Sequence, residues 1–512
     1  MLGVLAVITT LHLSGDVPVA GGDYLLVPFE VPAGTVELEV AHDDGSSSQI
    51  LDWGVWDPQG FRGWGGGLTD AATIGAAESS RGYLSGSMSA GTWYVVVGKA
   101  QLGGVPGRYT IDVTLRDAAT LVPGPRAPWT AVVLEHTRRW YAGDFHVHSQ
   151  DSGDAAATLD QIVELARARG LDFVLLSDHN TSAQVPRLAA RQVGTSDLLL
   201  VRGAEITTYH GHANGVGIGA YVDHRVGLDG VGAPTIAAAV AAQGGALIIN
   251  HPELDLGELC IGCAWRNTDT PWAQVAGVEI QTGNADLTGA IFTPRAIALW
   301  DQQLDAGHRL AAIGGSDDHR AGGETGPGAA RVGSPTTMVL ADELSEAALV
   351  AAVKAGRTVV KLNGPDDPMV ELVAIDADAP ARTAAIGDTL DGALAVELIA
   401  TVTGAGAEGA NAELWHDGAL VAATAVSGGV ARFDRPVTGD VERYRVELYV
   451  NGAHATVTSH VFVHGAVIAC ANSGGEGECG PGGCCATGGG GAGVAAVLGL
   501  GVLMVVARRR RR

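Results

Sequence analysis

The stretch Asp144-Phe145-His146-Val147-His148-Ser149 (DFHVHS) closes an apolar run with two histidines separated by one residue. Side chains at positions i and i+2 of a β-strand point to the same face of a sheet, so both imidazoles can reach one metal ion. A single pair of this kind is a weak signal. Its recurrence in other strand-like segments is what indicates a metal centre.

Four more apolar segments end in potential metal ligands. They are LDFVLLSDHN (171–180) with Asp178 and His179, LLLVRGAEIT (198–207) with Glu205, ALIINHPE (246–253) with His251, and LAAIGGSDDH (310–319) with Asp317 and His319. Strand ends that carry unpaired histidines and acids would be costly without a counter-charge. We therefore expect these side chains to converge on metal ions. For the isolated His224 and His308 we expect structural or surface roles.

The region around these segments alternates strand-like runs with helical patterns, as parallel α/β proteins do. Thr158 and Gln161 form a capping box, and apolar residues at positions 159, 162, 163 and 166 make one stripe of a helix that ends before Gly170. SEAALVAAVKAG (345–356) repeats the pattern. In a barrel built this way the strand ends meet at one rim, which brings ligands distant in sequence together.

The order DFHVHS, SDHN, AEIT followed by GHANGVG, INHPE and GGSDDH resembles the metal-dependent hydrolases of the PHP (polymerase and histidinol phosphatase) superfamily. The resemblance covers about residues 140–365, and GVEIQTGN and AGRTVV within it resemble the carbaryl-hydrolase-like (CehA/McbA) branch. It implies a distorted (β/α)7 barrel with two or three divalent metal ions at its rim. A mixed set of histidine and carboxylate ligands suits zinc, manganese or iron.

The resemblance also implies a role for each ligand. His146 and His148 would bind a first metal ion together with Glu205 and Asp317. Glu205 would bridge to a second ion, whose other ligand is His251.

The residues expected around a third metal ion match the superfamily less closely. Asp154 stands where many members of the superfamily have a histidine, and with His179 and His319 it would bind a third or displaced ion. His212 fits the histidine that follows the bridging glutamate, with His210 as its competitor. Asp178 is either a ligand or a carboxylate that orients an imidazole.

The expected activity is hydrolysis of an ester bond in a small molecule. Two cations that share a carboxylate can hold a hydroxide at neutral pH, and a nearby imidazole can protonate the leaving group. The resemblance implies a phosphoric, carboxylic or carbamic ester. A phosphate pocket should offer Arg or Lys beside the metal ions. Arg202, Arg320 and Arg331 are the only nearby basic candidates, and a structural or solvent-facing role is equally expected for each, so the sequence does not choose between the ester classes. A catalytically inactive, metal-binding surface adhesion or binding protein is the alternative. The expected catalytic residues are Glu205, His212, Asp317 and His319.

The expected fold is multi-domain: the central barrel flanked by two β-sandwiches, with a C-terminal transmembrane helix. Residues 1–14 are expected to be a weak or truncated export signal, with a first strand or a misassigned start codon as the alternatives. Residues 15–120 are expected to form a β-sandwich similar to pre-peptidase C-terminal domains, 130–365 the PHP domain and 366–466 an Ig-like β-sandwich. A Gly- and Cys-rich linker at 467–491 and the transmembrane helix with five arginines at 492–512 follow. Core packing is the preferred role of Trp53, Trp56 and Trp64, and a carbohydrate platform is the other.

The C-terminal tail resembles the MYXO-CTERM sorting tail of myxobacterial surface proteins. It implies an exported protein of the cell envelope or outer surface, anchored in the membrane by residues 492–512 and recognised by processing machinery near the cysteines. The net charge of −24 argues against nucleic acid as a partner. For Cys260 and Cys263 a disulfide is favoured over free thiols.

Overall fold

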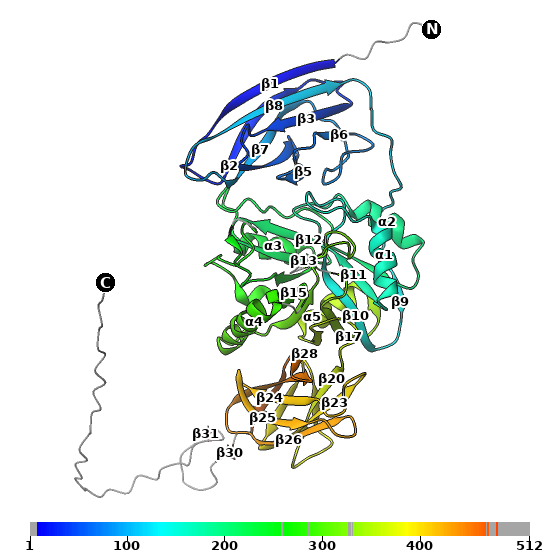
Figure 1. The fold of residues 1–512 in the computed structure, drawn as a ribbon, viewed down its shortest axis with the longest axis vertical. Helices are drawn as coiled ribbons and strands as arrows, with labels where there is room; N and C mark the ends of the chain where they lie inside the picture. Colours follow the sequence, from blue (N-terminus) through cyan, green and yellow to red (C-terminus); the bar gives the residue numbers. More distant parts are fainter. Residues whose placement is uncertain are drawn as a thin grey trace, which may run out of the picture.

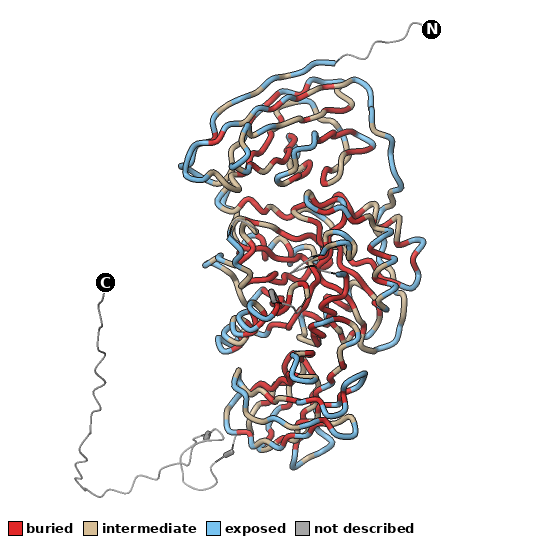
Figure 2. Tube along the Cα trace, viewed as in Figure 1, coloured by how far each residue is buried: buried red, intermediate tan, exposed pale blue. Residues whose placement is uncertain are grey.

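The computed structural model describes residues 8–466, except 258–259, 285–286, 326–328 and 330, together with residues 468–469 and 478–479. Figure 1 shows three regions that follow one another along the longest axis, with the N-terminal strands at one end and the C-terminal sandwich at the other. The mixed sheet of the central region lies between them. Figure 2 shows buried residues along its strands.

The N-terminal region is a sandwich of two antiparallel four-stranded sheets. One sheet has the order β1 (Ile8–Val17), β8 (Gly107–Arg116), β3 (Glu37–Asp43) and β6 (Ala72–Gly75), and the other has the order β2 (Tyr24–Val31), β7 (Gly91–Gln101), β4 (Ile50–Asp57) and β5 (Gly60–Gly66). Trp53, Trp56 and Trp64 are all buried, so core packing is confirmed for them. A solvent-facing carbohydrate platform built from the three rings is therefore wrong, although Trp64 also lines a cavity between the sandwich and the central region.

The expected export signal at 1–14 overlaps a strand. Residues 8–17 form β1, which pairs with β8 from Ile8 opposite Arg116 to Val17 opposite Gly107. Exposed and half-buried residues alternate along β1, as in a strand that covers one face of a sheet. Over its described part this segment is the first strand that the sequence left open as an alternative, and residues 1–7 lie outside the described residues.

The central region is built on a mixed sheet with helices packed beside it. Its strands, in chain order, are β10 (Arg139–Val147), β11 (Phe173–Leu176), β12 (Leu199–Thr208), β13 (Gly211–Val216), β14 (Ala246–Ile249), β15 (Val275–Thr282), β16 (Ala311–Gly315), β17 (Thr336–Ala341) and β19 (Thr358–Lys361). The helices are α1 (Leu159–Ala168), α2 (Val185–Val193), α3 (Ala233–Ala242), α4 (Leu287–Asp305) and α5 (Glu346–Lys354). A short pair, β9 (Val133–Glu135) and β18 (Leu344–Ser345), and the 3-10 turn η2 (Trp272–Gln274) complete the region.

The expected (β/α)7 barrel is wrong. Among the described residues 44% lie in strands and 13% in helices, and five α-helices occur there. Strand β12 turns directly into the antiparallel β13 without a helix, and β13 is also antiparallel to β14. Gly211, with a φ of 139°, makes this tight reversal possible, because such a backbone conformation disfavours residues with a side chain. The motif order alone did not predict this hairpin.

The C-terminal region is a second sandwich that shares a sheet with the central region. One sheet has the order β21 (Thr383–Ala385), β20 (Met369–Asp376), β23 (Ala395–Thr403) and β26 (Val430–Pro436). The other continues the central sheet from β19 through β28 (Ala453–Thr458), β27 (Val441–Val450), β24 (Asn411–His416) and β25 (Ala419–Ala425), with β29 (Val461–Gly465) and β22 (Thr389–Ala393) beside β27. This continuous sheet joins the two regions through backbone hydrogen bonds.

The expected transmembrane helix is not part of the described fold. None of the helices in the described ranges is long and apolar enough to cross a bilayer. The segment 492–512 lies outside the described residues, as does most of 467–491, in which only the strand pair β30 (Ile468–Ala469) and β31 (Glu478–Cys479) is described.

Candidate metal centre

The expected metal ligands come from strand ends that meet at one place in the central region. His146 lies near the end of β10 and His148 directly after it, His179 follows β11, and Glu205 lies on β12. The others lie on or after later strands, namely His212 on β13, His251 after β14, and Asp317 and His319 after β16. Backbone hydrogen bonds join the ends of β10 and β16, since the Asp317 amide donates to the His146 carbonyl at 2.7 Å.

The first group of ligand atoms is the set that the sequence predicts for one metal ion. Potential ligand atoms of His146, His148, Glu205 and Asp317 all lie within 4.8 Å of one another. Oδ1 of Asp317 is 3.2 Å from Nε2 of His146 and 3.0 Å from Nε2 of His148. The two carboxylates approach the imidazoles from different strands, so the four side chains surround a common point.

Several of these atoms are buried without a hydrogen-bond partner. Such atoms show whether the centre suits a cation, because a bound cation would be coordinated by them. Four buried atoms make no hydrogen bond of acceptable geometry here, namely Nε2 of His146, His148 and His212 and Oε2 of Glu205. Charged groups nevertheless lie close to them: Asp317 Oδ1 is within 3.2 Å of the first two nitrogens, and His179 Nδ1 is 2.9 Å from Glu205 Oε2. The other ring nitrogens are anchored, with His146 Nδ1 3.2 Å from Glu279 and His148 Nδ1 3.0 Å from the Ser152 hydroxyl. Buried polar atoms without a partner are costly. A divalent cation coordinated by these atoms removes that cost, so the residues present fit a metal ion.

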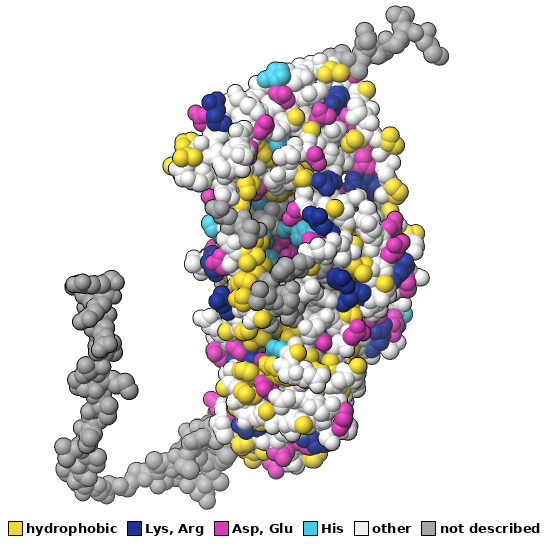
Figure 3. All heavy atoms as spheres, in the orientation of Figure 1, with side chains coloured by type: hydrophobic (Ala, Val, Ile, Leu, Met, Phe, Trp, Pro, Cys, Tyr) yellow, Lys and Arg dark blue, Asp and Glu magenta, His cyan; other side chains and the backbone are white. Residues whose placement is uncertain are grey.

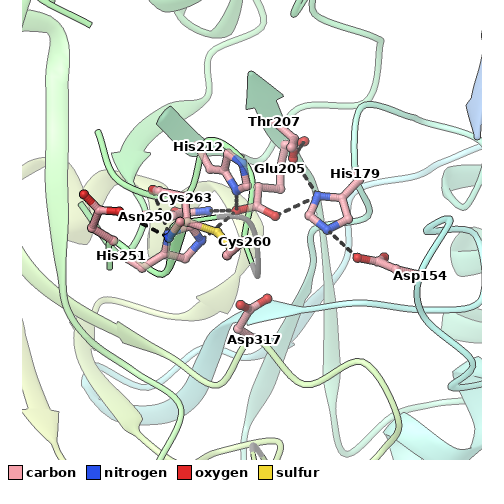
Figure 4. The surroundings of a disulfide bond; sticks show 12 residues. Asp154, His179, Glu205, Thr207, His212, Asn250, His251, Cys260, Cys263 and Asp317 are labelled. Atoms are coloured by element: carbon pink, nitrogen blue, oxygen red, sulfur yellow. Dashed lines mark hydrogen bonds and ion pairs between the residues drawn. A yellow bond between two sulfur atoms is a disulfide. The ribbon is translucent and has the colours of Figure 1, made fainter. Parts of the chain in front are cut away.

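Glu205 also contacts the second expected site. Its Oε1 is 3.2 Å from Nε2 of His251 and 3.3 Å from Nδ1 of His212, and it accepts a hydrogen bond of 2.8 Å from the Asn250 amide. Its Oε2 is 3.5 Å from Nε2 of His148. One carboxylate thus faces both groups of histidines, which is the arrangement expected of a bridging ligand. Figure 4 shows Glu205 between His179 on one side and His212 and His251 on the other.

The residues expected around a third ion also lie together. Oδ2 of Asp154 is 3.4 Å from Nε2 of His179 and 3.3 Å from Nε2 of His319. His148, His179 and His319 form a further group whose ligand atoms lie within 4.8 Å of one another. The side chain of Asp154 is 59% exposed, so this part of the centre opens toward solvent.

Asp178 and His210 lie outside these groups. Asp178 accepts hydrogen bonds from the backbone and hydroxyl of Ser149, at 2.6 and 2.8 Å, and so fixes the residue that follows His148. Burial, with a smaller contribution from Asp151, raises the pKa of Asp178 to about 7. His210 lies 3.3 Å from Asp23 of the N-terminal sandwich. Of the two histidines that compete for one role, His212 is the one beside Glu205.

Glu279 is a residue of the centre that the sequence analysis missed. It is 1% exposed, its Oε1 lies 3.2 Å from His146 Nδ1, and its Oε2 accepts a hydrogen bond of 2.8 Å from the His251 amide. It holds residues of both expected metal sites. The available signal was a single acid in the middle of the apolar strand VAGVEIQT (275–282).

Two of the ligands occupy strained backbone conformations. His251 has a φ of 26° and Asp317 a φ of 57°. Positive φ is uncommon outside glycine, and such residues cluster at functional sites. The conformation turns both side chains back toward the centre at points where their strands end.

The pKa values of His148 and His146 are shifted in opposite directions. Burial lowers the pKa of His148 to about 3, with help from the neighbouring His319 and His179, so this imidazole is neutral and able to ligate. Burial works against the charge of His146, but Asp317, Glu205 and Glu279 outweigh it and raise the pKa of this imidazole. The pKa of Glu205 is held well below its usual range, since the surrounding histidines outweigh the opposing effect of burial.

The centre forms the floor of a cavity of about 670 Å³. Figure 3 shows histidine and acidic side chains in a hollow between the N-terminal sandwich and the central region. Cys260 and Cys263 lie at its edge and are joined as the disulfide that the sequence favours, with 5.6 Å between their Cα atoms. Among the described lining residues there is no Lys or Arg. Arg202, considered above for a phosphate pocket, is paired with Glu346 at 2.6 Å instead.

No protein-family model, curated protein or solved structure matches this chain.

Proposed function

We propose that this chain is a metal-dependent hydrolase of small-molecule esters, of the PHP type that its motifs resemble. The observation that carries the proposal is the set of buried His146, His148 and Glu205 atoms without hydrogen-bond partners, next to a cavity that Glu205 and Asp317 line. A buried cluster that served only to stabilise the fold would be expected to satisfy its polar atoms within the protein.

The metal ions would be held by the ligands described above. His146, His148, Asp317 and Glu205 would bind one divalent ion, and Glu205 with His251 and His212 would bind a second. Zinc, manganese or iron suits this mixture of imidazole and carboxylate. Asp154, His179 and His319 offer a third site, and their partly exposed position predicts that it binds more weakly than the others.

When bound, such ions supply Lewis acidity, which polarises an ester oxygen and acidifies water. The protein's own residues provide position and proton transfer. Glu279 and Ser152 fix the ring orientations of His146 and His148 through their Nδ1 atoms. Nδ1 of His319 donates to the carbonyl of Asp317 at 2.7 Å, which leaves Nε2 on the side of Asp154 and the cavity. When the third metal site is empty, His319 can deliver a proton from this nitrogen to the leaving oxygen.

The test uses the full chain, loaded separately with Zn²⁺, Mn²⁺ and Fe²⁺. Bound metal is measured by mass spectrometry, and turnover is assayed with p-nitrophenyl phosphate, bis-p-nitrophenyl phosphate, and aryl carboxyl and carbamate esters. We expect metal-dependent hydrolysis of at least one ester class, abolished in His148→Ala and retained in the exposed control His12→Ala. Full metal loading without turnover of any ester would contradict the proposed hydrolase activity and favour an inactive, metal-binding surface protein.

We also propose that the chain is exported and held at the cell envelope by residues 492–512. The support is the sequence layout alone: a Gly- and Cys-rich segment, an apolar run and five arginines. Fractionation of cells expressing the full chain and a chain truncated after residue 466 tests it. Envelope association that persists in the truncated chain would contradict the proposal.

A further inference from the structure

The N-terminal sandwich forms one wall of the cavity above the metal centre. Tyr24, Ile50, Asp52 and Trp64 of the sandwich line the same 670 Å³ space as the candidate ligands. The hairpin residue Tyr209, between β12 and β13, lies at the junction of the two. A substrate that reached the metal ions would therefore also contact the sandwich.

Close packing fixes this wall over the centre. The rings of Tyr24 and Tyr209 stack at 5.6 Å between centroids, and those of Phe61 and Tyr221 stack at 3.6 Å. The guanidinium of Arg225 lies 4.4 Å from the ring of Trp56. These contacts all cross between the two regions, and aromatic pairs of this kind stabilise an interface beyond the effect of the area they bury. The sandwich is thus a fixed part of the site.

A second set of contacts crosses the same boundary through charged groups. Arg187 on α2 pairs with Asp151 of the central region and, at 3.1 Å, with Glu78 of the sandwich. The hydroxyl of Thr181 donates to the carbonyl of Gly82 at 2.9 Å. These polar contacts fix the position of the sandwich along the central region as well as the distance between the two regions.

Asp52 is the carboxylate that the sandwich brings to the cavity. The hydroxyl of Tyr209 donates to its Oδ2 at 2.7 Å, whereas its Oδ1 has no hydrogen-bond partner among the described residues. Gly98 makes this contact possible, because a Cβ at that position would collide with the Tyr209 hydroxyl. Asp52 therefore presents one carboxylate oxygen to whatever occupies the cavity.

The charge of the cavity favours a cationic ligand at this point. The other acids in the lining belong to the metal centre, where bound cations would offset them, and no Lys or Arg among the described lining residues offsets Asp52. Tyr24 and Trp64, whose rings lie 6.3 Å apart in an edge arrangement, line the cavity beside it. A carboxylate next to aromatic rings attracts an ammonium group through charge and through the ring quadrupoles. An anionic group at the same point would be repelled.

We propose that Asp52, Tyr24, Trp64 and Tyr209 form a subsite that selects esters carrying an ammonium group at the end away from the scissile bond. The proposal rests on the proposed hydrolase function for its substrate, but the subsite itself binds a cation with or without turnover. Asp52 and Tyr209 act here as specificity residues. The step that the enzyme performs on the ester is the hydrolysis proposed above.

The first arm of the test compares matched substrates that differ only in charge. Acetylthiocholine is compared with 3,3-dimethylbutyl thioacetate, and p-nitrophenyl phosphorylcholine with p-nitrophenyl 3,3-dimethylbutyl phosphate. We expect kcat/KM to favour the cationic member of the hydrolysed pair at least about 10-fold, mainly through KM. Asp52→Asn should reduce this ratio to about 2-fold or less, while Asp16→Asn, an exposed site on the same sandwich, should leave it unchanged. Equal kcat/KM values for the wild-type protein would overturn the proposal.

The second arm needs no turnover. Tetramethylammonium chloride is titrated into the metal-free full chain by calorimetry, with sodium chloride at the same ionic strength as control. Binding that is lost in Asp52→Asn and kept in Asp16→Asn supports the subsite even if no ester is hydrolysed, in which case only the hydrolase function fails. Absence of tetramethylammonium binding to a folded wild-type protein overturns the subsite.

Discussion

Oε1 of Glu205 lies 3.2 Å from Nε2 of His251, although the two residues come from strands separated in the sheet by β13. The same oxygen lies 3.4 Å from Nε2 of His146. Glu205 thus contacts imidazole nitrogens of both expected metal sites through a single oxygen.

Replacing this carboxylate tests the bridging role. Glu205→Gln keeps the size of the side chain but removes its charge and replaces one acceptor oxygen with a donor. We expect loss of at least one bound metal ion and a fall in ester turnover of at least about 100-fold. Metal content and kcat are measured together, and Glu30→Gln, at an exposed position of β2 in the sandwich, serves as the control. Unchanged metal stoichiometry in Glu205→Gln would refute the bridging assignment.

Removal of metal should destabilise the fold. Without cations the buried histidines and acids keep atoms that have no partner, and a ligand that binds only the native state adds about 2.7 kcal/mol at a free concentration of about 100 Kd. We expect the urea midpoint to fall after chelation and to recover when Zn²⁺ or Mn²⁺ is added back. His146→Ala should abolish the recovery. A midpoint that does not respond to chelation or to added metal would contradict the account.

Glu279 should control metal affinity without being a ligand of the first group. Because it holds the ring of His146 and the backbone of His251, we expect Glu279→Gln to weaken metal binding about 10- to 100-fold. Competition with a chromophoric chelator measures this affinity. An affinity equal to that of the wild-type protein would show that the ring orientations are fixed by other contacts.

Asp52 should make stability depend on pH. Burial is the main cause that raises its pKa to about 6 from an ordinary value of 3.8, so the folded chain binds a proton that the unfolded chain has released between these values. The contribution of Asp52 to the free energy of unfolding is therefore greatest at low pH and falls as pH rises from about 4 to about 6. The groups that act on Asp52 are Tyr209 through its hydrogen bond, His179, Asp154 and the nearby phenol of Tyr24.

Comparison with Asp52→Asn isolates that effect. We expect the variant to be more stable than the wild-type protein by roughly 1–3 kcal/mol at pH 7.5, and the difference to shrink toward zero near pH 4. Binding of tetramethylammonium to the wild-type protein should weaken over the same interval as the carboxylate is protonated. Urea unfolding at both pH values measures the first effect. A stability difference that does not change with pH would contradict it.

The junction between the sandwich and the centre should be sensitive at Gly98. A methyl group there would meet the Tyr209 hydroxyl and the side chain of Trp64, so we expect Gly98→Ala to destabilise the chain by about 1–3 kcal/mol. Gly86→Ala is the matched control, because no atom lies within 4 Å of a Cβ at that position. Equal stability of the two variants would show that the sandwich is not held as tightly as described.

Local features of the centre followed from the sequence. The capping box of Thr158 and Gln161 is present, and α1 ends before Gly170 as the spacing predicts. The candidate ligands at the strand ends also meet. Buried histidines and acids at the ends of apolar strands are costly unless they contact one another or a cation.

Other features depended on relationships that periodicity does not encode. The hairpin between β12 and β13 reverses a strand that the motif order placed in a barrel, and its turn depends on the conformation of Gly211. Glu279 sits inside an apolar strand, and nothing in the periodicity of that strand shows that its carboxylate reaches His146 and His251. Asp52 and Tyr209 are 157 residues apart and become neighbours only when the sandwich packs on the central region.

The most direct measurement is anomalous diffraction from crystals of the full chain grown with saturating Mn²⁺ or Zn²⁺. The proposed metal centre predicts an anomalous peak about 2.0–2.2 Å from Nε2 of both His146 and His148, and a second peak on the His251 side of Glu205. A well-ordered centre without a peak near any of these histidines would contradict it.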